Sequence, residues 1–285
     1  MARKTSQARI GLALGGGGAR GFAHVAALKA FDELGLKPAH IIGTSIGAIM
    51  GAGYASGASA KEIEEFSLAT FSERGKALAK LVDLRPRSLR ELWTAERQSL
   101  FQIDVERVLD VYVPDLIARD FAQTKIPFSA VAADFYGWSE VELDSGSLRQ
   151  AVAASSALPT IFKPVVIDGR VLVDGGLVNP MPFDRLKDCD IIVAVDVVGG
   201  PSPRHGRNIP NQRDLIFGTT QILMQSITNA KLRTIRPDVL LKPRINDFKV
   251  LDFLKVKEVL AASAPITEEL KQKLETILEK NAAKA

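Results

Sequence analysis

The chain has 285 residues, 46% of them hydrophobic, and a formal net charge of +4. This length and composition can bury a large core and exclude a mainly disordered protein, while 37 basic against 33 acidic residues is too small an excess to indicate a nucleic-acid partner. A single cysteine, Cys189, excludes an internal disulfide and a cysteine-rich zinc site, and the three histidines lack metal-ligand spacing. We therefore expect no metal and no cofactor.

The N-terminal part of the chain alternates predicted strands and helices. Ile10–Leu14 is a short apolar run that ends at glycine, and residues 21–34 carry apolar side chains at helical spacing. The order of strand, turn and helix repeats over residues 40–55. Residues 41–60 are uncharged and long enough to cross a membrane, but their five glycines favour a buried strand, a turn and a small-residue helix.

The middle of the chain is predicted to be a helical insertion. Ser59 and Glu62 have the spacing of a capping box, which predicts a helix to about Thr70. Residues 74–97 are rich in Arg, Lys and Leu, and we expect a helical basic cover segment near 74–115. Two interpretations stay open here: a solvated amphipathic cover, or a lid that contacts anionic lipid headgroups.

The second half of the chain completes a layered α/β pattern. Strands that alternate with helices favour one domain over residues 1–285 with a mostly parallel central sheet. The patterns predict strands at 128–133, 141–143 and 191–198, a hairpin with strands at 165–167 and 171–173, a loop at 201–210, a helix at 214–234 and C-terminal helices from about 252.

Ser45 lies in a candidate nucleophile turn. Gly43-Thr44-Ser45-Ile46-Gly47 follows an apolar strand and begins a helix, which is the context that a G-x-S-x-G elbow requires. Small flanking residues allow the tight turn, and the turn exposes the serine hydroxyl near the positive end of a helix. The alternative, a plain turn in which Ser45 caps the helix, is equally compatible with this motif alone.

A glycine-rich loop at residues 15–21 comes directly after the first strand. Such a loop presents backbone N–H groups to an anion. Its G-x-G-x-x-G pattern suggests a dinucleotide site, but no acidic residue ends the second strand, and no Lys-Ser or Lys-Thr follows to form a Walker loop. A glycine hinge is the structural alternative. An oxyanion hole built from the amides of Gly17 and Gly18 fits both this loop and a nucleophilic Ser45.

A serine nucleophile needs a base, and Asp174 is the strongest candidate. His24 lies among apolar residues of a predicted helix, His40 precedes a strand and His205 lies in a polar loop. Asp174 ends a strand and is followed by two glycines, although such a turn is usually structural. Free aspartate has a pKa of about 3.9, so this role requires a short contact with Ser45 and a dry environment.

Taken together, these motifs resemble the patatin-like phospholipases of the bacterial branch, which are related to the catalytic domain of neuropathy target esterase. Residues 16–21 are similar to the oxyanion motif of that family, 43–47 to its nucleophile elbow and 174–176 to its catalytic aspartate motif. Residues 154–159, leading to 162–164, are similar to its serine-proline segment.

This resemblance implies a three-layer α/β/α fold and a Ser45/Asp174 dyad in place of a triad. It also implies an oxyanion hole and substrate-binding loop at Gly16, Gly17 and Gly18. From the position of Arg20 in this loop we infer two roles for it: it holds the glycine loop, by orienting it or by anchoring it through pairing with a carboxylate, or it orients a phosphate.

The function implied by the resemblance is that of a serine lipid acyl hydrolase of the phospholipase A or lysophospholipase type. Its expected partner is an acyl lipid or phospholipid, without nucleic acid. The expected location is cytoplasmic, with peripheral contact at the inner face of the membrane. Two alternatives remain: a membrane- or partner-binding module of the same fold with little turnover, and a nucleotide-dependent enzyme that uses the glycine loop.

Overall fold

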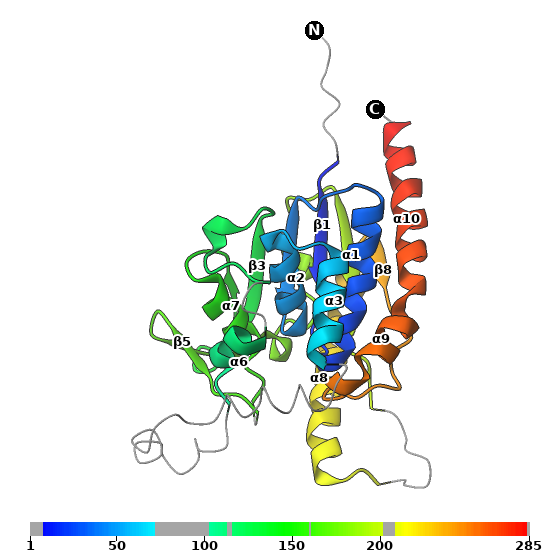
Figure 1. Cartoon of the computed structure of the whole chain (residues 1–285). Helices are drawn as coiled ribbons and strands as arrows, with labels where there is room; N and C mark the ends of the chain where they lie inside the picture. The colour runs from blue at the N-terminus through cyan, green and yellow to red at the C-terminus, as the bar shows by residue number, and fades with distance from the viewer. Residues whose placement is uncertain (1–7, 72–102, 113–115, 160, 202–208, 284–285) are drawn as a thin grey trace, which may run out of the picture.

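The computed structural model describes residues 8–71, 103–112, 116–159, 161–201 and 209–283 (Figure 1). The predicted basic segment at 74–97 and His205 lie outside these described residues, as does most of the predicted loop at 201–210.

An eight-stranded sheet forms the centre of the fold, and its main path has the strand order β5-β6-β3-β2-β1-β7-β8. The pairs among β3, β2, β1, β7 and β8 are parallel, whereas β4 and β6 pair antiparallel with β3, and β5 pairs antiparallel with β6. The predicted mostly parallel sheet with an added hairpin is therefore confirmed. The strands are β1 (Ile10–Leu14), β2 (His40–Thr44), β3 (Phe128–Asp134), β4 (Ser139–Leu143), β5 (Val165–Ile167), β6 (Arg170–Asp174), β7 (Ile191–Val195) and β8 (Val239–Leu241).

Helices cover the sheet, and the sequence pattern predicts most of them but not the α-helix at Leu148–Ser155. The α-helices are α1 (His24–Glu33), α2 (Ile46–Ser56), α3 (Ala60–Phe71), α6 (Val105–Tyr112), α7 (Leu148–Ser155), α8 (Gln212–Thr234), α9 (Val256–Ser263) and α10 (Pro265–Ala282). The short 3-10 helices are η1 (Gly18–Ala23), η3 (Phe121–Gln123), η4 (Gly175–Leu177), η5 (Phe183–Arg185) and η6 (Phe253–Lys255).

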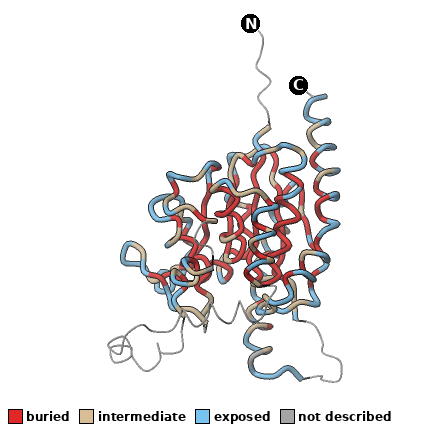
Figure 2. The backbone as a smooth tube through the Cα atoms, viewed as in Figure 1, coloured by how far each residue is buried: buried red, intermediate tan, exposed pale blue. Residues whose placement is uncertain are grey.

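The two faces of the sheet bury two separate apolar clusters, because side chains alternate along each strand. On β1, Leu12 and Leu14 enter the larger cluster with residues of α1, α2, α7 and α10. Ala13 enters a smaller cluster that includes Phe183 of η5 and is covered in part by Leu232 of α8. Figure 2 shows the buried residues concentrated along the strands and the adjoining helices. The expected three layers are therefore present, and the helical layer over the larger cluster is thicker than the layer over the smaller one.

Helix α8 extends beyond the sheet on the side where the parallel strands end. The chain enters this helix after the carboxyl end of β7 and leaves it toward the start of β8, so the first turns of α8 lie at the carboxyl edge (Figure 1). None of the helices in the described ranges combines the length and the apolar character needed to cross a bilayer.

Some predicted boundaries shift for local reasons. The strand expected at 191–198 ends at Val195. The carboxylate of the next residue, the buried Asp196, accepts a hydrogen bond from the Val198 N–H, which turns the chain out of the sheet. The helix expected from residue 21 begins as 3-10 helix η1 and becomes α-helical at His24. The predicted capping box is confirmed, since Ser59 and Glu62 each bond the backbone N–H of the other.

Candidate active site

The sheet register brings the ends of β2 and β6 together. Strand β4 pairs with both Val131 and Ala132 of β3, and it therefore occupies one edge of β3 along both residues. On the other edge, Thr44 at the end of β2 pairs with Val131, and Asp174 at the end of β6 pairs with Ala132. The two strands approach each other from opposite directions along one edge. As a result, Ser45, the residue after Thr44, lies beside Asp174.

The turn at Ser45 has the strained geometry of a nucleophile elbow. Ser45 adopts φ 56° and ψ −124°, a conformation that non-glycine residues rarely adopt, and it precedes the first residue of α2. A Cβ on Gly43 would lie 2.6 Å from the Ala48 backbone, and one on Gly47 would strike the Leu14 carbonyl. Both flanking positions therefore require glycine. The Ser45 side chain makes no capping bond, so the N-cap interpretation of this serine is not supported.

The Ser45 hydroxyl donates a hydrogen bond to Asp174. The distance from Ser45 Oγ to Asp174 Oδ2 is 2.5 Å, and Asp174 Oδ1 accepts from the Gly176 N–H at 2.7 Å. The Asp174 side chain is buried. Burial raises the pKa of Asp174 to about 6, although the bonds from Ser45 and Gly176 act in the opposite direction. The short contact and the dry environment that an aspartate base requires are both present.

Two further serines hold the backbone of Ser45, and sequence reasoning assigned neither of them a role. The Ser45 N–H donates to Ser155 Oγ at 2.9 Å, and the Ser155 hydroxyl donates to the Val131 carbonyl at 2.6 Å. The Ser156 hydroxyl donates to the Ser45 carbonyl at 3.2 Å. Ser155 and Ser156 both belong to the serine-proline segment, and the similarity of this segment to the family motif was the sequence signal for their role. Because the Ser45 amide is occupied, an oxyanion would need other donors.

The glycine loop supplies two such donors. The amides of Gly15, Gly16 and Ala19 donate to the carbonyls of Val195, Pro180 and Val250, respectively. Within the described part of the chain, the amides between them, those of Gly17 and Gly18, have no acceptor in the protein. The loop also lies against Ser45, since a methyl group on Gly16 would be 3.3 Å from Ser45 Cβ. These positions are compatible with the predicted oxyanion hole.

Close packing explains why glycine occupies the centre of this loop. A Cβ on Gly17 would strike the Val197 carbonyl, and a Cβ on Gly18 would strike the Val250 carbonyl. Gly18 also has φ +59°, in the left-handed region that favours glycine. Any side chain at either position would displace the two unpaired amides.

Arg20 lies underneath the glycine loop and is fully buried. Its Nε donates to the Gly17 carbonyl at 3.4 Å, and the side-chain amide of Gln221 on α8 faces its guanidinium group. Burial lowers the pKa of Arg20 to about 10, while Asp196 and Asp252 oppose this shift and keep the group charged. Of the two roles expected for Arg20, this geometry favours orientation of the loop over direct contact with a phosphate.

Neither described histidine contacts Ser45. His24 is fully buried and its Nε2 lies 2.8 Å from the Gly15 carbonyl, so the imidazole supports the glycine loop. Burial lowers the pKa of His24 to about 4, which keeps the ring neutral. His40 bonds Ser129 at 3.0 Å, at the opposite end of β2 from Ser45.

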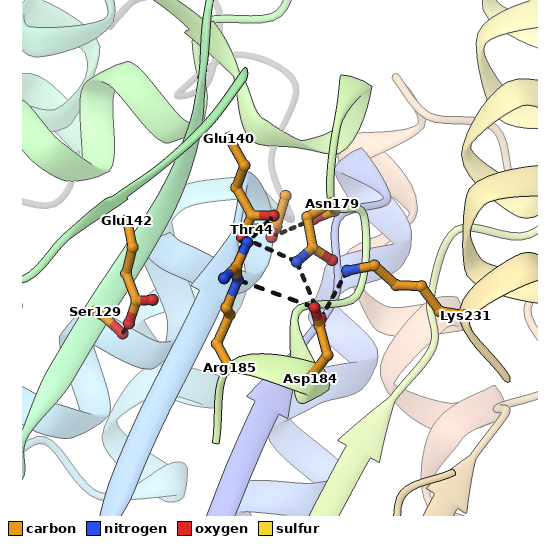
Figure 3. A network of polar contacts seen from close by, with 8 residues as sticks. All are labelled: Thr44, Ser129, Glu140, Glu142, Asn179, Asp184, Arg185 and Lys231. Carbon is orange, nitrogen blue, oxygen red and sulfur yellow. Dashed lines mark hydrogen bonds and ion pairs between the residues drawn. The ribbon is translucent and has the colours of Figure 1, made fainter. Parts of the chain in front are cut away.

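A polar network holds the loop that follows Asp174 against β2 (Figure 3). The Thr44 hydroxyl donates to the backbone carbonyl of the fully buried Asn179 at 2.8 Å. The Asn179 amide donates to Glu140 at 3.0 Å and to Asp184 at 3.1 Å. Thr44, the residue before Ser45, is thus tied to Asn179, five positions after Asp174.

Charged side chains complete this network. Arg185 donates to both carboxylate oxygens of Glu140, at 2.9 and 2.8 Å, and Lys231 of α8 donates to Asp184 at 2.6 Å (Figure 3). The network therefore connects β4, η5 and α8 around the loop that follows Asp174, which restricts movement of this loop relative to Ser45.

The side chain of Met224, in the middle of α8, packs beside the dyad. Its terminal methyl group would be 3.5 Å from a Cβ on Gly16 and 2.8 Å from a Cβ on Gly176. The same Cβ on Gly16 would lie 3.3 Å from Ser45 Cβ, and the same Cβ on Gly176 would lie 2.9 Å from Asp174 Oδ1. Met224 thus places an apolar group against both loops of the site, and no sequence motif indicated it.

Among the described residues, no group of three His, Cys, Asp or Glu side chains could hold a metal ion.

Comparison with known families identifies the family to which the chain belongs. The family model for patatin-like phospholipases matches residues 12–187, a range that includes Ser45, Asp174 and the glycine loop. The chain belongs to the patatin-like phospholipase family. An uncharacterized NTE family protein from Mycobacterium bovis is 32% identical over 200 residues, covering 69% of this chain and 51% of that protein. The resemblance to the branch related to neuropathy target esterase is confirmed.

Other patatin-like relatives are much longer than this chain. Human patatin-like phospholipase domain-containing protein 6 is 32% identical over 202 residues, which cover 69% of this chain and 14% of that protein. Lysophospholipase NTE1 of Debaryomyces hansenii is 27% identical, covering 91% of this chain and 18% of that protein. The chain thus spans about half the length of the mycobacterial relative and under a fifth of the other two.

Two solved structures share the fold of this chain. VipD from Legionella pneumophila superposes with a TM-score of 0.53 at 12% identity, covering 94% of this chain and 67% of that chain. Human GIVD cytosolic phospholipase A2 superposes with a TM-score of 0.50 at 10% identity, covering 96% of this chain and 63% of that chain. At this identity the likeness concerns the fold alone.

Proposed function

We propose that this protein is a serine lipid acyl hydrolase of the phospholipase A or lysophospholipase type. The observation that carries the proposal is the 2.5 Å hydrogen bond from Ser45 Oγ to the buried carboxylate of Asp174. A serine hydroxyl becomes nucleophilic when an adjacent base accepts its proton, and a carboxylate whose pKa is raised to about 6 is a stronger base than free aspartate.

In the proposed first step, Ser45 Oγ attacks the acyl carbonyl carbon of the lipid ester while Asp174 Oδ2 takes the hydroxyl proton. The carbonyl oxygen becomes an oxyanion, and the unpaired amides of Gly17 and Gly18 donate hydrogen bonds to it. The intermediate collapses when the bond to the alcohol breaks and Asp174 delivers its proton to that alcohol. An acyl ester on Ser45 remains.

In the proposed second step, Asp174 removes a proton from water, which attacks the acyl ester. The bond from the acyl group to Ser45 Oγ then breaks, the proton returns to Ser45 and the fatty acid leaves. Arg20 keeps the glycine loop in place throughout, and Met224 supplies an apolar wall beside the acyl group. The presence of lysophospholipase NTE1 among the relatives supports this assignment of substrate class.

The test is active-site labelling together with lipid hydrolysis. A fluorophosphonate probe is expected to label Ser45 in the wild-type protein and not in Ser45→Ala. Asp174→Asn is expected to lower both labelling and hydrolysis of a short-chain ester by about 10²–10⁴-fold, the usual contribution of a general base. The amount of folded protein is checked by circular dichroism.

A matched control lies on the same hairpin. Asp168 is exposed at the turn between β5 and β6, so Asp168→Asn is expected to keep wild-type turnover. Full activity in Asp174→Asn would contradict the dyad, and absence of turnover on every ester of a lipid-class screen would contradict hydrolysis. The same screen, with Ser45→Ala as the blank, identifies the head group and the position that is cleaved.

A further inference from the structure

Exposed apolar side chains gather on the two sides of the candidate site. On one side is the hairpin between β3 and β4, where Trp138 is 91% exposed and Tyr136 is 74% exposed. On the other side is the first half of α8, with exposed Leu215, Ile216, Ile222 and Leu223. We call these six residues the apolar rim.

Topology places both parts of the apolar rim at the edge of the sheet that holds Ser45. The hairpin continues β3 past its carboxyl end, and the Phe135 N–H donates to the Val171 carbonyl at 2.9 Å, three residues before Asp174. The first turns of α8 project beyond the same edge (Figure 1). The dyad therefore lies between two exposed apolar protrusions.

The surface of α8 is unusual for an exposed helix. Residues 215–230 contain no charged side chain, whereas solvent-facing helix surfaces normally carry several. Gln221 and Thr228 are buried and Met224 packs at the dyad, while Ile222 and Leu223 point outward. A cleft of about 910 Å³ opens beside the first turns of α8, with Leu215, Ile222 and Leu251 in its lining.

The chemistry of the apolar rim matches a lipid surface. Trp and Tyr prefer the boundary between hydrocarbon and water, and aliphatic side chains on a helix face enter the acyl region. Lys163, two residues before β5, and Arg170, the first residue of β6, are exposed, and neither pairs with a carboxylate in the described part of the chain. The exposed acidic residue of this hairpin is Asp168, since Asp174 is buried. This charge balance suits anionic headgroups.

We propose that the apolar rim docks the protein on a lipid surface, with the β3–β4 hairpin and α8 entering the interface on either side of Ser45 and Asp174. This inference rests on the proposed function for its choice of partner, because an enzyme that cleaves acyl lipids must meet them in aggregates. Docking through this face presents the dyad to lipid, while the end of α10 lies at the opposite end of the fold (Figure 1).

The experiment is flotation of the full chain with vesicles, in a Ser45→Ala background so that the lipid stays intact. Vesicles contain phosphatidylcholine with or without phosphatidylglycerol. Adding Ile222→Glu and Leu223→Glu is expected to lower the partition coefficient about ten-fold or more, because two aliphatic side chains no longer enter the interface. Replacing Lys163 and Arg170 with Gln is expected to weaken binding only to vesicles with phosphatidylglycerol.

Ile235 supplies the matched control, because it is exposed at the other end of α8. Ile235→Glu is expected to bind vesicles like its parent, and the Ile222→Glu/Leu223→Glu protein with Ser45 intact is expected to hydrolyse a monomeric short-chain ester at the wild-type rate. Equal vesicle binding by the Ile222/Leu223 and Ile235 variants would overturn the proposal. A wild-type dimer in sedimentation that Ile222→Glu/Leu223→Glu dissociates would also overturn it, since the apolar rim would then join two copies.

The results separate this inference from the proposed function. Vesicle binding through the apolar rim without ester hydrolysis would leave the docking surface standing and remove the hydrolase. Ester hydrolysis without vesicle binding would leave the hydrolase standing and remove the docking surface.

Discussion

Ser45 and Asp174 come from strands that meet end to end along one edge of β3, and their side chains share a hydrogen bond of 2.5 Å. The register, rather than a flexible loop, sets this distance. Because the carboxylate is buried, its protonation state couples the proposed chemistry to pH and to the stability of the fold.

The first prediction concerns the pH dependence of turnover. Asp174 accepts a proton only as the carboxylate, and burial raises its pKa to about 6. We expect kcat/KM for a soluble ester, and the rate of fluorophosphonate labelling, to rise with pH through about 6 and then level off. A profile that is flat through this range would show that another group controls the proton transfer. Asp168→Asn serves as the control, and its profile is expected to match that of the wild type.

The second prediction concerns the stability cost of the same group. The pKa of Asp174 is about 6 in the folded protein and 3.8 for an unperturbed side chain. Below the lower value both states are protonated, and between the two values only the unfolded chain releases its proton. The contribution of Asp174 to the free energy of unfolding therefore falls as pH rises from about 4 to about 6, by about 3 kcal/mol in all.

Asp174→Asn removes this titration. In urea denaturation, the stability of the variant relative to the wild type is expected to increase between about pH 4 and pH 7. A constant difference in stability across this range would show that Asp174 titrates at the same pH in both states. Because the comparison uses the change with pH, the hydrogen bonds altered by the substitution do not affect it.

The third prediction concerns the glycine loop. In Gly17→Ala, the new methyl group would strike the Val197 carbonyl and displace the loop amides. We expect a loss of about 2 kcal/mol or more in stability and, in the folded fraction, a loss of Ser45 labelling. Gly200→Ala is the control, since nothing lies within 4 Å of its Cβ position. Normal labelling in Gly17→Ala would exclude this loop as the oxyanion hole.

The fourth prediction separates support from catalysis among the histidines. His40→Gln is expected to leave ester hydrolysis unchanged, because His40 lies at the far end of β2 from Ser45. His24→Leu removes the partner of the buried Gly15 carbonyl and is expected to lower stability by about 1–3 kcal/mol. Labelling of Ser45 in folded His24→Leu is expected to persist, and its complete loss would assign His24 a part in the chemistry.

The sequence allowed prediction of the parts of the site that local motifs encode. Ser45 and Asp174 each stand in a turn whose glycines are visible in the sequence, and the structure places the two side chains in contact. The role of Ser155 was not predictable, because its bond to the Ser45 amide joins residues 110 positions apart. Met224 was missed for a related reason: apolar and uncharged polar residues are mixed along α8 without a clear apolar stripe, so the sequence does not show which face of the helix meets Ser45 and Asp174.

The two oxygens of Asp174 are not equivalent. Oδ1 is held by the Gly176 amide, which leaves Oδ2 as the oxygen that faces Ser45. In the proposed reaction a single atom must then collect the proton from the nucleophile and hand it to the departing alcohol. Only esters that bind with their alcohol oxygen within reach of Oδ2 can complete this transfer. The fixed carboxylate would thus select the orientation in which a lipid is cleaved, independently of the shape of the acyl pocket.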